Sequence, residues 1–521
     1  MLGAILAILI FLATSVSIFR LIQIKEYFFP SLWAHFDYPS SYKLFINKKD
    51  FLLLFFWLLT LFISLLFGKI VISERAAGLF LIIIFILFIK RHEQLHLINW
   101  TPKAWFIIVL ALLLNARILE ISNYDLSILF LLLTNGIQFT LVIFSTYIAN
   151  LITNIYSIFL FNKAKNKIKK WLEKNPERLI IGITGSYGKT STKEILSHLL
   201  SYKYKVLKSP QRLNAEIGLS QFILNSDIDN YDILVLEMGG RKTGEVKKMT
   251  EIFQPKIVFL TGLTSQHLAT FGSMENIIKG EGLEIFSNLS SSSKAFLNGA
   301  SELVYKIYED LNLRDKYLYA KEGSQFYSRN EIFSVEGTTF DFVYPEGKIS
   351  LETNLIGRHF LENLIGALAC SYILEIKPED LKEEIKKINL LPHQFQVVKK
   401  ANPLIIDDSY NCNIVGVEKA LDFFCSIPLE KRYVFFAGIL ELGVETPDFY
   451  SKLIESFKCI DKLILTFKDF TEVFINKLKE KVIVYNEESV KDILKEENME
   501  NIGILILGRI PKNLLGELNS L

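Results

Sequence analysis

The sequence predicts a multi-domain protein in which an N-terminal α-helical membrane domain precedes two α/β domains with mainly parallel sheets. Two features of the 521-residue chain support this fold class. Half of all residues are hydrophobic, and the long apolar stretches gather before about residue 165. Beyond residue 179, short apolar runs alternate with amphipathic helical patterns, which is typical of parallel sheets covered by helices.

About five apolar segments are expected to span a membrane, because roughly 20 apolar residues cross the hydrocarbon core. They cover residues 2–19, 51–72, 76–89 and 104–121, and the fifth begins at Leu126. Lysine and arginine residues follow the first, third and fifth segments, which places the N-terminus outside and the rest of the chain after the fifth segment in the cytoplasm. We therefore expect a multi-pass protein of the cell inner membrane that contacts lipid, with cytoplasmic α/β domains and a retained first segment.

Composition also suggests the domain boundaries. We expect a transmembrane domain over 1–161, a basic linker over 162–178, a central domain over 179–355 and a C-terminal domain over 356–521. The linker stretch FNKAKNKIKKWLEKNPERL is basic and amphipathic, so it either lies against anionic headgroups or forms a solvated charged helix.

Charge and cysteine content narrow the functional classes. The formal net charge of +2 gives no indication of nucleic-acid binding. The four cysteines have no CxxC spacing and lie in the α/β region, so we expect reduced, mostly buried thiols.

The α/β region contains two series of predicted buried strands. Helical patterns such as TSTKEILSHLLSYK, SMENIIKGEGLEIF and HFLENLIGALACSYIL lie between or beside them. In parallel sheets, ligands gather at the carboxyl ends of the strands, and small or polar residues stand at these ends here. The predicted strands are LIIGITG, DILVLEMGG, KIVFLTGL and KAFLNG, then PLIIDDSYN, RYVFFAGIL, KLILTF and IGILILG.

The stretch GITGSYGKTSTKE predicts a phosphate-binding loop. Its glycines, Gly182, Gly185 and Gly188, give G-x-x-G-x-x-G-K-T-S, which departs from the strict P-loop because no glycine stands six residues before Lys189. The physical logic is unchanged, since a strand, a glycine turn and a helix N-terminus together present backbone N–H groups to an anion. Lys189 would reach the β- and γ-phosphates of ATP, and Thr190 would offer its hydroxyl to Mg²⁺.

This loop resembles that of the Mur ligases, the ATP-dependent amide-forming enzymes of peptidoglycan precursor synthesis. It is most similar to the MurF type, which adds D-alanyl-D-alanine to UDP-N-acetylmuramoyl-tripeptide. The resemblance runs from about Arg178 to Leu521 and implies a P-loop ATPase-like central domain, a Rossmann-like C-terminal domain, and ATP and Mg²⁺ as cofactors. Its further motifs, in family order, are RLNAEIGLS, LVLEMGGRKTGE, TGLTSQHLATFGS, AFLNGASE, GRHFLENLIGALA, IIDDSYNCN and AGILELG.

The same resemblance assigns site residues. Metal ligands would be Thr190, Glu237 and His267. Substrate contacts would be Asn214 and Glu441. Catalytic roles would fall to Lys189, His267, Glu281 and Asp408. The nucleotide would be held by Gly185, Ser186, Gly188, Lys189, Thr190, Ser191, Asn298, His359, Asn363, Asp407, Tyr410 and Asn411.

Without the resemblance, two of these assignments have ordinary structural alternatives. A lone histidine such as His267 is more often a satisfied core residue. Asp407 and Asp408 end a hydrophobic strand, where an aspartate can also cap the following helix.

The chain departs from the family at a metal-binding position. Mur ligases of this type carry a carbamylated lysine after the FGS segment, and the ungapped equivalent here is Glu281, with Lys279 two residues earlier. A glutamate could supply a permanent carboxylate in place of the carbamate. The alternatives are a local shift that brings in Lys279, or the loss of one metal ion.

Other departures concern substrate contacts. The asparagine of the family's TNI turn is Gly262, the arginine of its GR segment is Gln394, and its C-terminal KGS is replaced by residues 507–509, LGR. The aspartates after the AFLN strand are absent, and the predicted membrane domain stands where the family has a soluble UDP-binding domain.

Two classes of function follow from this sequence. The first is an ATP-dependent ligase that joins an amine to a carboxylate acceptor of the muramoyl-peptide type, either as a MurF or as a paralogue acting on another membrane-associated acceptor. The second is a non-catalytic, membrane-anchored nucleotide-binding scaffold. An ATP-driven transporter is disfavoured, because the apolar segments hold few charges beyond Arg117.

Overall fold

A computed structural model describes three single residues and most of the chain after residue 126. The expected spans over 2–19, 51–72 and 76–89, and all but three residues of 104–121, lie outside the described residues. The chain divides into two compact units, Met1–Ile158 and Phe159–Leu521. The described residues are Phe106, Ile107, Leu110 and 127–389, 391–399, 403–410, 412–439, 446–467, 469–486 and 501–520.

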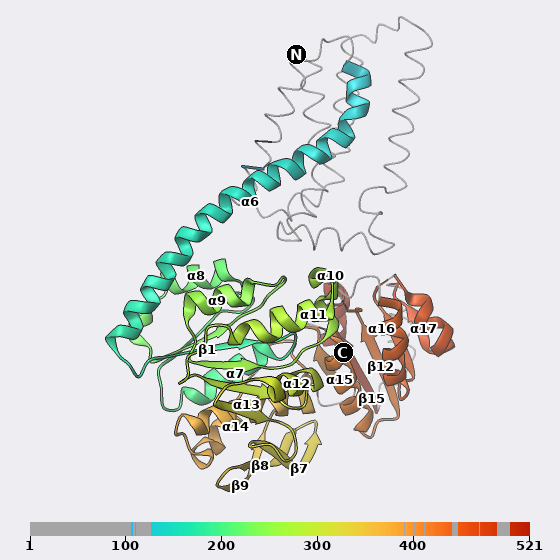
Figure 1. Cartoon of the computed structure of the whole chain (residues 1–521). Coiled ribbons are helices and arrows are strands. Elements are labelled where there is room, and N and C mark those ends of the chain that lie inside the picture. The colour runs from blue at the N-terminus through green and yellow to red at the C-terminus, as the bar shows by residue number, and fades with distance from the viewer. Residues whose placement is uncertain are drawn as a thin grey trace, which may run out of the picture. The chain divides into compact units, whose positions relative to one another are not determined.

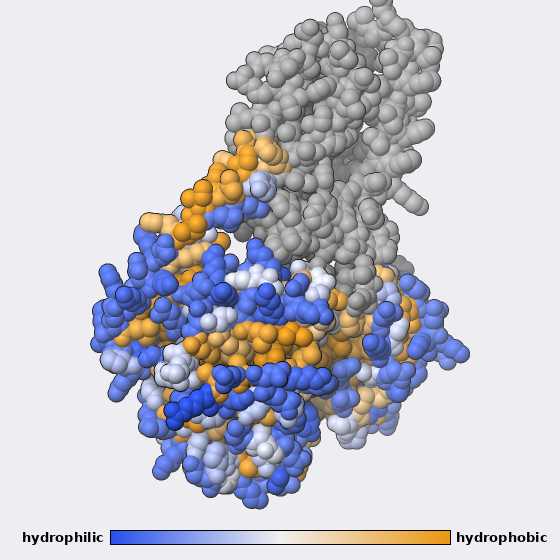
Figure 2. Space-filling model, in the orientation of Figure 1, coloured by the Kyte–Doolittle hydropathy of each residue, from blue (hydrophilic) through white to orange (hydrophobic). Residues whose placement is uncertain are grey.

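Helix α6 (Ser127–Lys174) begins one residue after the expected start of the fifth apolar segment. Within the described part of the chain, it is the one helix long and apolar enough to cross a membrane, in the stretch Phe144–Lys174, where an 18-residue window has a mean hydropathy of 1.3. Figure 2 shows an orange, hydrophobic surface along the upper part of this helix and blue, hydrophilic residues toward its lower end. Its exposed large apolar side chains are Phe144, Tyr147, Leu151, Ile152, Ile155, Tyr156, Ile158 and Phe159.

The last turns of α6 pack on the first α/β domain. Phe161, Ala164, Ile168 and Trp171 recur at helical spacing and are buried in one of that domain's core clusters. The Trp171 indole N–H donates to the Ile228 carbonyl at 2.7 Å. One face of the predicted linker is therefore part of the folded domain, which its basic composition does not indicate.

The first α/β domain contains a six-stranded parallel sheet in the order β2-β3-β1-β4-β5-β6. Alternate residues of its strands face opposite sides: on β3, Ile233 and Val235 join one core cluster and Leu234 and Leu236 the other. Strands predicted from four apolar runs are confirmed. The bounds are β1 (Leu179–Thr184), β2 (Val206–Lys208), β3 (Ile233–Glu237), β4 (Ile257–Leu260), β5 (Lys294–Asn298) and β6 (Asp315–Tyr319).

Helices cover both faces of this sheet (Figure 1), with α7 and α13 contributing to one core cluster and α8 and α9 to the other. The sequence did not predict the antiparallel sheet that follows, β7 (Tyr327–Ser334), β8 (Gly337–Tyr344) and β9 (Gly347–Thr353). The helices are α7 (Lys189–Leu200), α8 (Glu216–Asn225), α9 (Glu245–Phe253), α10 (Leu268–Phe271), α11 (Met274–Ile277), α12 (Glu302–Asp310), α13 (Arg358–Ile373) and α14 (Lys382–Lys386).

The second α/β domain contains a six-stranded sheet in the order β10-β11-β15-β12-β13-β14, parallel except for β10. All four strands predicted here are present. The bounds are β10 (Gln396–Lys399), β11 (Leu404–Asp408), β12 (Lys431–Phe436), β13 (Lys462–Leu465), β14 (Val482–Val484) and β15 (Ile502–Leu507), with α15 (Ile414–Ser426), α16 (Thr446–Leu453), α17 (Thr471–Leu478) and α19 (Lys512–Ser520).

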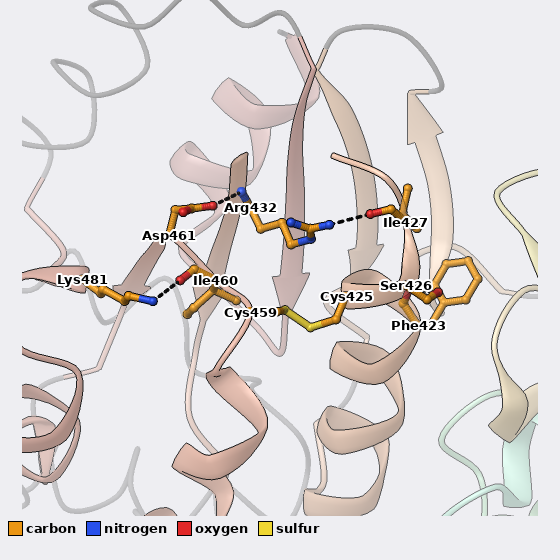
Figure 3. The surroundings of a disulfide bond; sticks show 9 residues. All are labelled: Phe423, Cys425, Ser426, Ile427, Arg432, Cys459, Ile460, Asp461 and Lys481. Carbon is orange, nitrogen blue, oxygen red and sulfur yellow. Dashed lines mark hydrogen bonds between the residues drawn. A yellow bond between two sulfur atoms is a disulfide. The ribbon is translucent and has the colours of Figure 1, made fainter. Parts of the chain in front are cut away.

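A disulfide joins Cys425, near the end of α15, to Cys459, just before β13 (Figure 3). Their Cα atoms are 5.9 Å apart, the spacing that a disulfide requires, although 34 positions separate them in the sequence. The prediction of reduced thiols is therefore wrong for this pair. Cys370 and Cys412 are buried thiols outside the disulfide, as predicted.

Candidate nucleotide and metal site

The phosphate loop joins the end of β1 to the start of α7, as the sequence predicts. Gly185 and Gly188 have φ angles of +133° and +82°, which glycine adopts at little cost. A Cβ at Gly185 would also lie 2.5 Å from the Thr261 hydroxyl. Lys189 folds over the loop, and its ammonium donates to the carbonyl oxygens of Gly185 and Ser186. Ser191, two residues after Lys189, is buried in the first turn of α7.

Glu237 lies at the carboxyl end of β3, where the sequence predicts a metal ligand. The residue is 3 % exposed. One oxygen, Oε2, accepts the Thr190 hydroxyl and the Lys193 ammonium, both at 3.1 Å. The other, Oε1, accepts the Asn214 amide at 3.2 Å. The sequence argument missed Lys193, although a lysine four residues after Lys189 lies on the same side of a helix.

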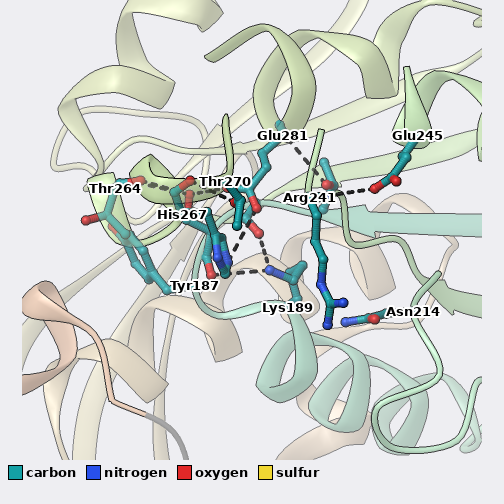
Figure 4. A network of polar contacts seen from close by, with 12 residues as sticks. Tyr187, Lys189, Asn214, Arg241, Glu245, Thr264, His267, Thr270 and Glu281 are labelled. Atoms are coloured by element: carbon teal, nitrogen blue, oxygen red, sulfur yellow. Dashed lines mark hydrogen bonds and ion pairs between the residues drawn. The ribbon is translucent and has the colours of Figure 1, made fainter. Parts of the chain in front are cut away.

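Glu281 and His267 form a second polar group beside the loop (Figure 4). The Glu281 carboxylate is buried, accepts the Ser186 hydroxyl at 2.5 Å and lies 3.7 Å from His267 Nε2. Lys279 is exposed. Of the two candidates for the family's carbamylated lysine, Glu281 is the one at the phosphate loop.

A π-helical turn, Ile278–Leu283, carries Glu281 to this position. The sequence predicts one continuous helix over 273–286, but the structure divides it into α11, the π-helical turn and a 3-10 turn over Glu284–Phe286. A side chain at Gly280 would collide with the Phe271 ring, with Cβ 2.5 Å from Cε1. Single π-helical turns inside helices are frequent at functional sites.

Thr190 and Glu237 are suited to bind Mg²⁺. Mg²⁺ takes one or two carboxylates and completes its octahedron with phosphate oxygens and water. Among the residues that the structure describes, no three His, Cys, Asp or Glu side chains converge on one point. The site would therefore depend on the nucleotide for its remaining ligands, and His267, the third predicted ligand, lies 3.7 Å from Glu281.

The glycine at position 262 has a local explanation. A Cβ there would lie 2.2 Å from Cζ of Tyr187, so the ring occupies the space that the family's asparagine would need. Burial first, and the Glu362 carboxylate second, raise the pKa of the Tyr187 hydroxyl to about 12. Tyr187 therefore stays neutral and packs across the end of β4.

Helix α13 carries two of the residues that the resemblance assigns to the nucleotide, His359 and Asn363. The Asn363 amide oxygen accepts the Thr192 hydroxyl at 3.2 Å and lies 3.0 Å from a Cβ built on Gly188. His359 is half-buried, and within the part of the chain that the structure describes its Nδ1 has no hydrogen-bond partner. Burial, and then the Lys419 cation, lower the pKa of His359 to about 3, which leaves a neutral ring with a free polar atom.

Asn298 ends β5 and is buried there. Its amide oxygen accepts the Ala300 N–H at 3.0 Å, so the side chain shapes its own turn.

In the second domain, Asp407 and Asp408 end β11. Asp407 accepts the Ser409 N–H at 2.9 Å and pairs with His393 Nδ1 at 2.6 Å. Neither aspartate caps α15, because the cap is Asn413, so the capping alternative is wrong. Burial raises the pKa of Asp408 to about 8, with a smaller contribution in the same direction from Asp407.

The remaining predicted residues are only partly placed. The Tyr410 N–H donates to the His393 carbonyl at 2.9 Å, and Arg509 donates to the Tyr410 carbonyl at 3.2 Å. Asn411 and Glu441 lie outside the described residues. An ion pair that the sequence did not indicate, Lys419 with Glu362 at 2.6 and 2.7 Å, joins α15 to α13.

Comparison with known proteins identifies two domains of one family. The chain matches the Mur ligase middle domain over residues 183–371 and the Mur ligase glutamate ligase domain over 393–508. It is 26% identical over 306 residues to the UDP-N-acetylmuramoyl-tripeptide–D-alanyl-D-alanine ligase of Escherichia coli, covering 58% of this chain and 67% of that protein. The corresponding ligase of Borreliella burgdorferi is 29% identical over 332 residues, with 60% and 68% covered.

Solved structures share the fold. MurF from Acinetobacter baumannii superposes with a TM-score of 0.64 at 20% identity, covering 70% of this chain and 81% of that one. MurF from Thermotoga maritima in complex with ADP gives a TM-score of 0.60 at 24% identity, with 68% and 80% covered. The chain spans about two thirds of the length of the relatives it matches in sequence.

Proposed function

The chain belongs to the Mur ligase family of ATP-dependent ligases, and from this we propose that it adds D-alanyl-D-alanine to a muramoyl-tripeptide. The observation that carries the proposal is the group of polar side chains around the phosphate loop, in which Lys189, Glu237 and Glu281 surround one strand-to-helix turn. The substrate assignment is supported by the likeness to the D-alanyl-D-alanine ligases.

In the proposed reaction, an oxygen of the substrate carboxylate attacks the γ-phosphorus of ATP. A new O–P bond forms, the bond to the β-phosphate oxygen breaks, and ADP leaves. The amine then attacks the carbonyl carbon of the acyl phosphate, a C–N bond forms, inorganic phosphate leaves, and the nitrogen loses a proton. Phosphoryl transfer needs mainly positioning and charge neutralisation from the protein.

Each part of the site has a role in these steps. The Lys189 ammonium and the loop N–H groups at the start of α7 bind the phosphates. Thr190 and Glu237 would hold Mg²⁺, which when bound neutralises charge on the phosphates. Burial raises the pKa of Asp408 to about 8, so this carboxyl group is mainly protonated at neutral pH, and the ionised fraction that would accept the proton of the amine grows as the pH rises towards 8. Glu281 supplies the permanent carboxylate that stands in for a carbamylated lysine.

The test is phosphate release by the detergent-purified full chain with ATP and Mg²⁺. UDP-N-acetylmuramoyl-tripeptide and D-alanyl-D-alanine are supplied singly and together. We expect release only with both, accompanied by the pentapeptide product in the mass spectrum. ATP binding that Lys189→Ala abolishes, without release on any of these substrates, would instead indicate another acceptor or a non-catalytic scaffold.

We also propose that the protein is a multi-pass inner-membrane protein whose α/β domains are cytoplasmic. The support is the exposed apolar side of α6 between Phe144 and Phe159, followed directly by lysines. Single cysteines at Ile155 and Lys169 test it in intact and opened membranes. We expect a membrane-impermeant maleimide to label Lys169→Cys only when the cytoplasmic side is open, and Ile155→Cys in neither case. Equal labelling of both positions would contradict the proposal.

A further inference from the structure

Lys193 is a fully buried lysine on α7, one helical turn after Lys189. Its ammonium donates to Glu237 Oε2 at 3.1 Å and lies 3.6 Å from Glu194 Oε1. A buried cation requires such partners, because it has lost its hydration. The proposed reaction gives Lys193 no task, since Lys189 is the lysine that faces the phosphate loop.

The contacts of Glu237 indicate what Lys193 does. A carboxylate offers about four lone-pair directions, two on each oxygen. On Oε2 both are used, by the Lys193 ammonium and the Thr190 hydroxyl. On Oε1 one is used, by the Asn214 amide. A cation that binds Glu237 therefore finds one available direction, on Oε1.

We propose that Lys193 is a positioning residue that makes Glu237 a one-oxygen ligand and thereby favours Mg²⁺ over Ca²⁺. Mg²⁺ demands a compact octahedron and retains several waters, whereas Ca²⁺ accepts both oxygens of one carboxylate at longer distances. With Oε2 occupied, the two-oxygen arrangement that suits Ca²⁺ is excluded. This inference rests on the proposed binding of ATP with a divalent cation.

The ratio of two affinities tests the proposal. Full-length wild type and Lys193→Met are titrated with Mg²⁺ or Ca²⁺ in the presence of ADP, and binding is followed by calorimetry. Both ions carry the same charge, so the loss of a nearby positive charge raises the affinity for both alike. The ratio of the two affinities therefore reports how the ion is coordinated. We expect the ratio of the Mg²⁺ affinity to the Ca²⁺ affinity to fall by about tenfold in Lys193→Met. In Lys193→Arg this ratio should return part of the way to the wild-type value. An unchanged ratio in Lys193→Met would overturn the proposal.

Two further variants keep the result interpretable. Lys208 pairs with Glu194 but is 46% exposed and does not contact Glu237, so Lys208→Met should retain the wild-type ratio. If Lys193→Met does not fold, the double variant Lys193→Met with Glu194→Gln replaces it, because this variant removes one nearby carboxylate along with the ammonium. The same fall in the ratio of the two affinities is expected. If wild type with ADP binds neither Mg²⁺ nor Ca²⁺, the proposed function itself is refuted. If it binds both ions and Lys193→Met does not change the ratio of their affinities, only the role of Lys193 is refuted.

Discussion

A methyl group at position 262 should disturb the phosphate loop. A Cβ built on Gly262 would lie 2.2 Å from Cζ of Tyr187 and 2.6 Å from Cε1 and Cε2. Carbon atoms in contact normally stand about 3.5–4.0 Å apart. The Tyr187 ring must therefore move by more than about 1 Å, or the end of β4 must shift.

The cost follows from how the ring is held. The Tyr187 N–H donates to the Gly262 carbonyl at 3.4 Å, Thr261 donates to the Tyr187 carbonyl, and the phenol is hydrogen-bonded to Ser301. Overpacking costs about 1–3 kcal/mol, and a lost hydrogen bond adds about 1 kcal/mol. We expect Gly262→Ala to lower the free energy of unfolding by about 2–4 kcal/mol. A displaced loop should also bind ADP at least about tenfold more weakly, since about 1.4 kcal/mol suffices for that change.

Urea unfolding and calorimetric ADP binding measure the two effects. Gly347→Ala is the matched control, because nothing lies within 4 Å of a Cβ there. In a Tyr187→Ala background, the Gly262→Ala substitution should cost almost nothing. The reasoning is refuted if Gly262→Ala behaves like the control, or if removing the ring leaves its cost unchanged.

Three further substitutions test other parts of the structure. Trp171→Ala should destabilise the protein by about 3–5 kcal/mol in thermal unfolding, because the indole is buried and hydrogen-bonded. Lys169→Ala, on the exposed side of α6, should change the stability little. Equal effects of the two substitutions would contradict the packing of α6. Because burial raises the pKa of Asp408 to about 8, against about 3.9 when unfolded, the folded state holds a proton that the unfolded chain releases between these pH values. Its contribution to stability therefore falls as pH rises from 4 to 8, by up to about 1.4 kcal/mol per pH unit, and Asp408→Asn should make urea-unfolding stability less dependent on pH; parallel pH profiles would contradict this. Glu281→Lys should release phosphate only when bicarbonate is added, and Glu281→Met should stay inactive with bicarbonate; rescue of both, or of neither, would speak against the equivalence of Glu281 and a carbamylated lysine.

The sequence predicted those parts of the site that follow from strand ends. Thr190, Glu237 and Asp407 stand where buried parallel strands end or the next helix begins, and such positions converge at one edge of a sheet. The phosphate loop was predictable because its glycines serve local backbone geometry.

The unpredicted features depend on contacts between distant segments. Three contacts are examples: Tyr187 with Gly262, Lys193 with Glu237, and Lys419 with Glu362. The two residues of each contact lie at least 44 positions apart in the sequence, and Lys193 and Glu237 have the smallest separation. No local pattern reports such contacts. The turn that presents Glu281 also depends on the Phe271 ring beside Gly280, so helical periodicity alone predicted a regular helix there.

Transfer of oxygen from the substrate to phosphate tests the central claim most directly. UDP-N-acetylmuramoyl-tripeptide labelled with ¹⁸O in its terminal carboxylate is incubated with the full chain, ATP, Mg²⁺ and D-alanyl-D-alanine, and the released phosphate is analysed by mass. If the carboxylate is activated as an acyl phosphate, each phosphate released carries one ¹⁸O from the substrate, and Lys189→Ala releases none. Unlabelled phosphate appearing together with the amide product would contradict the account.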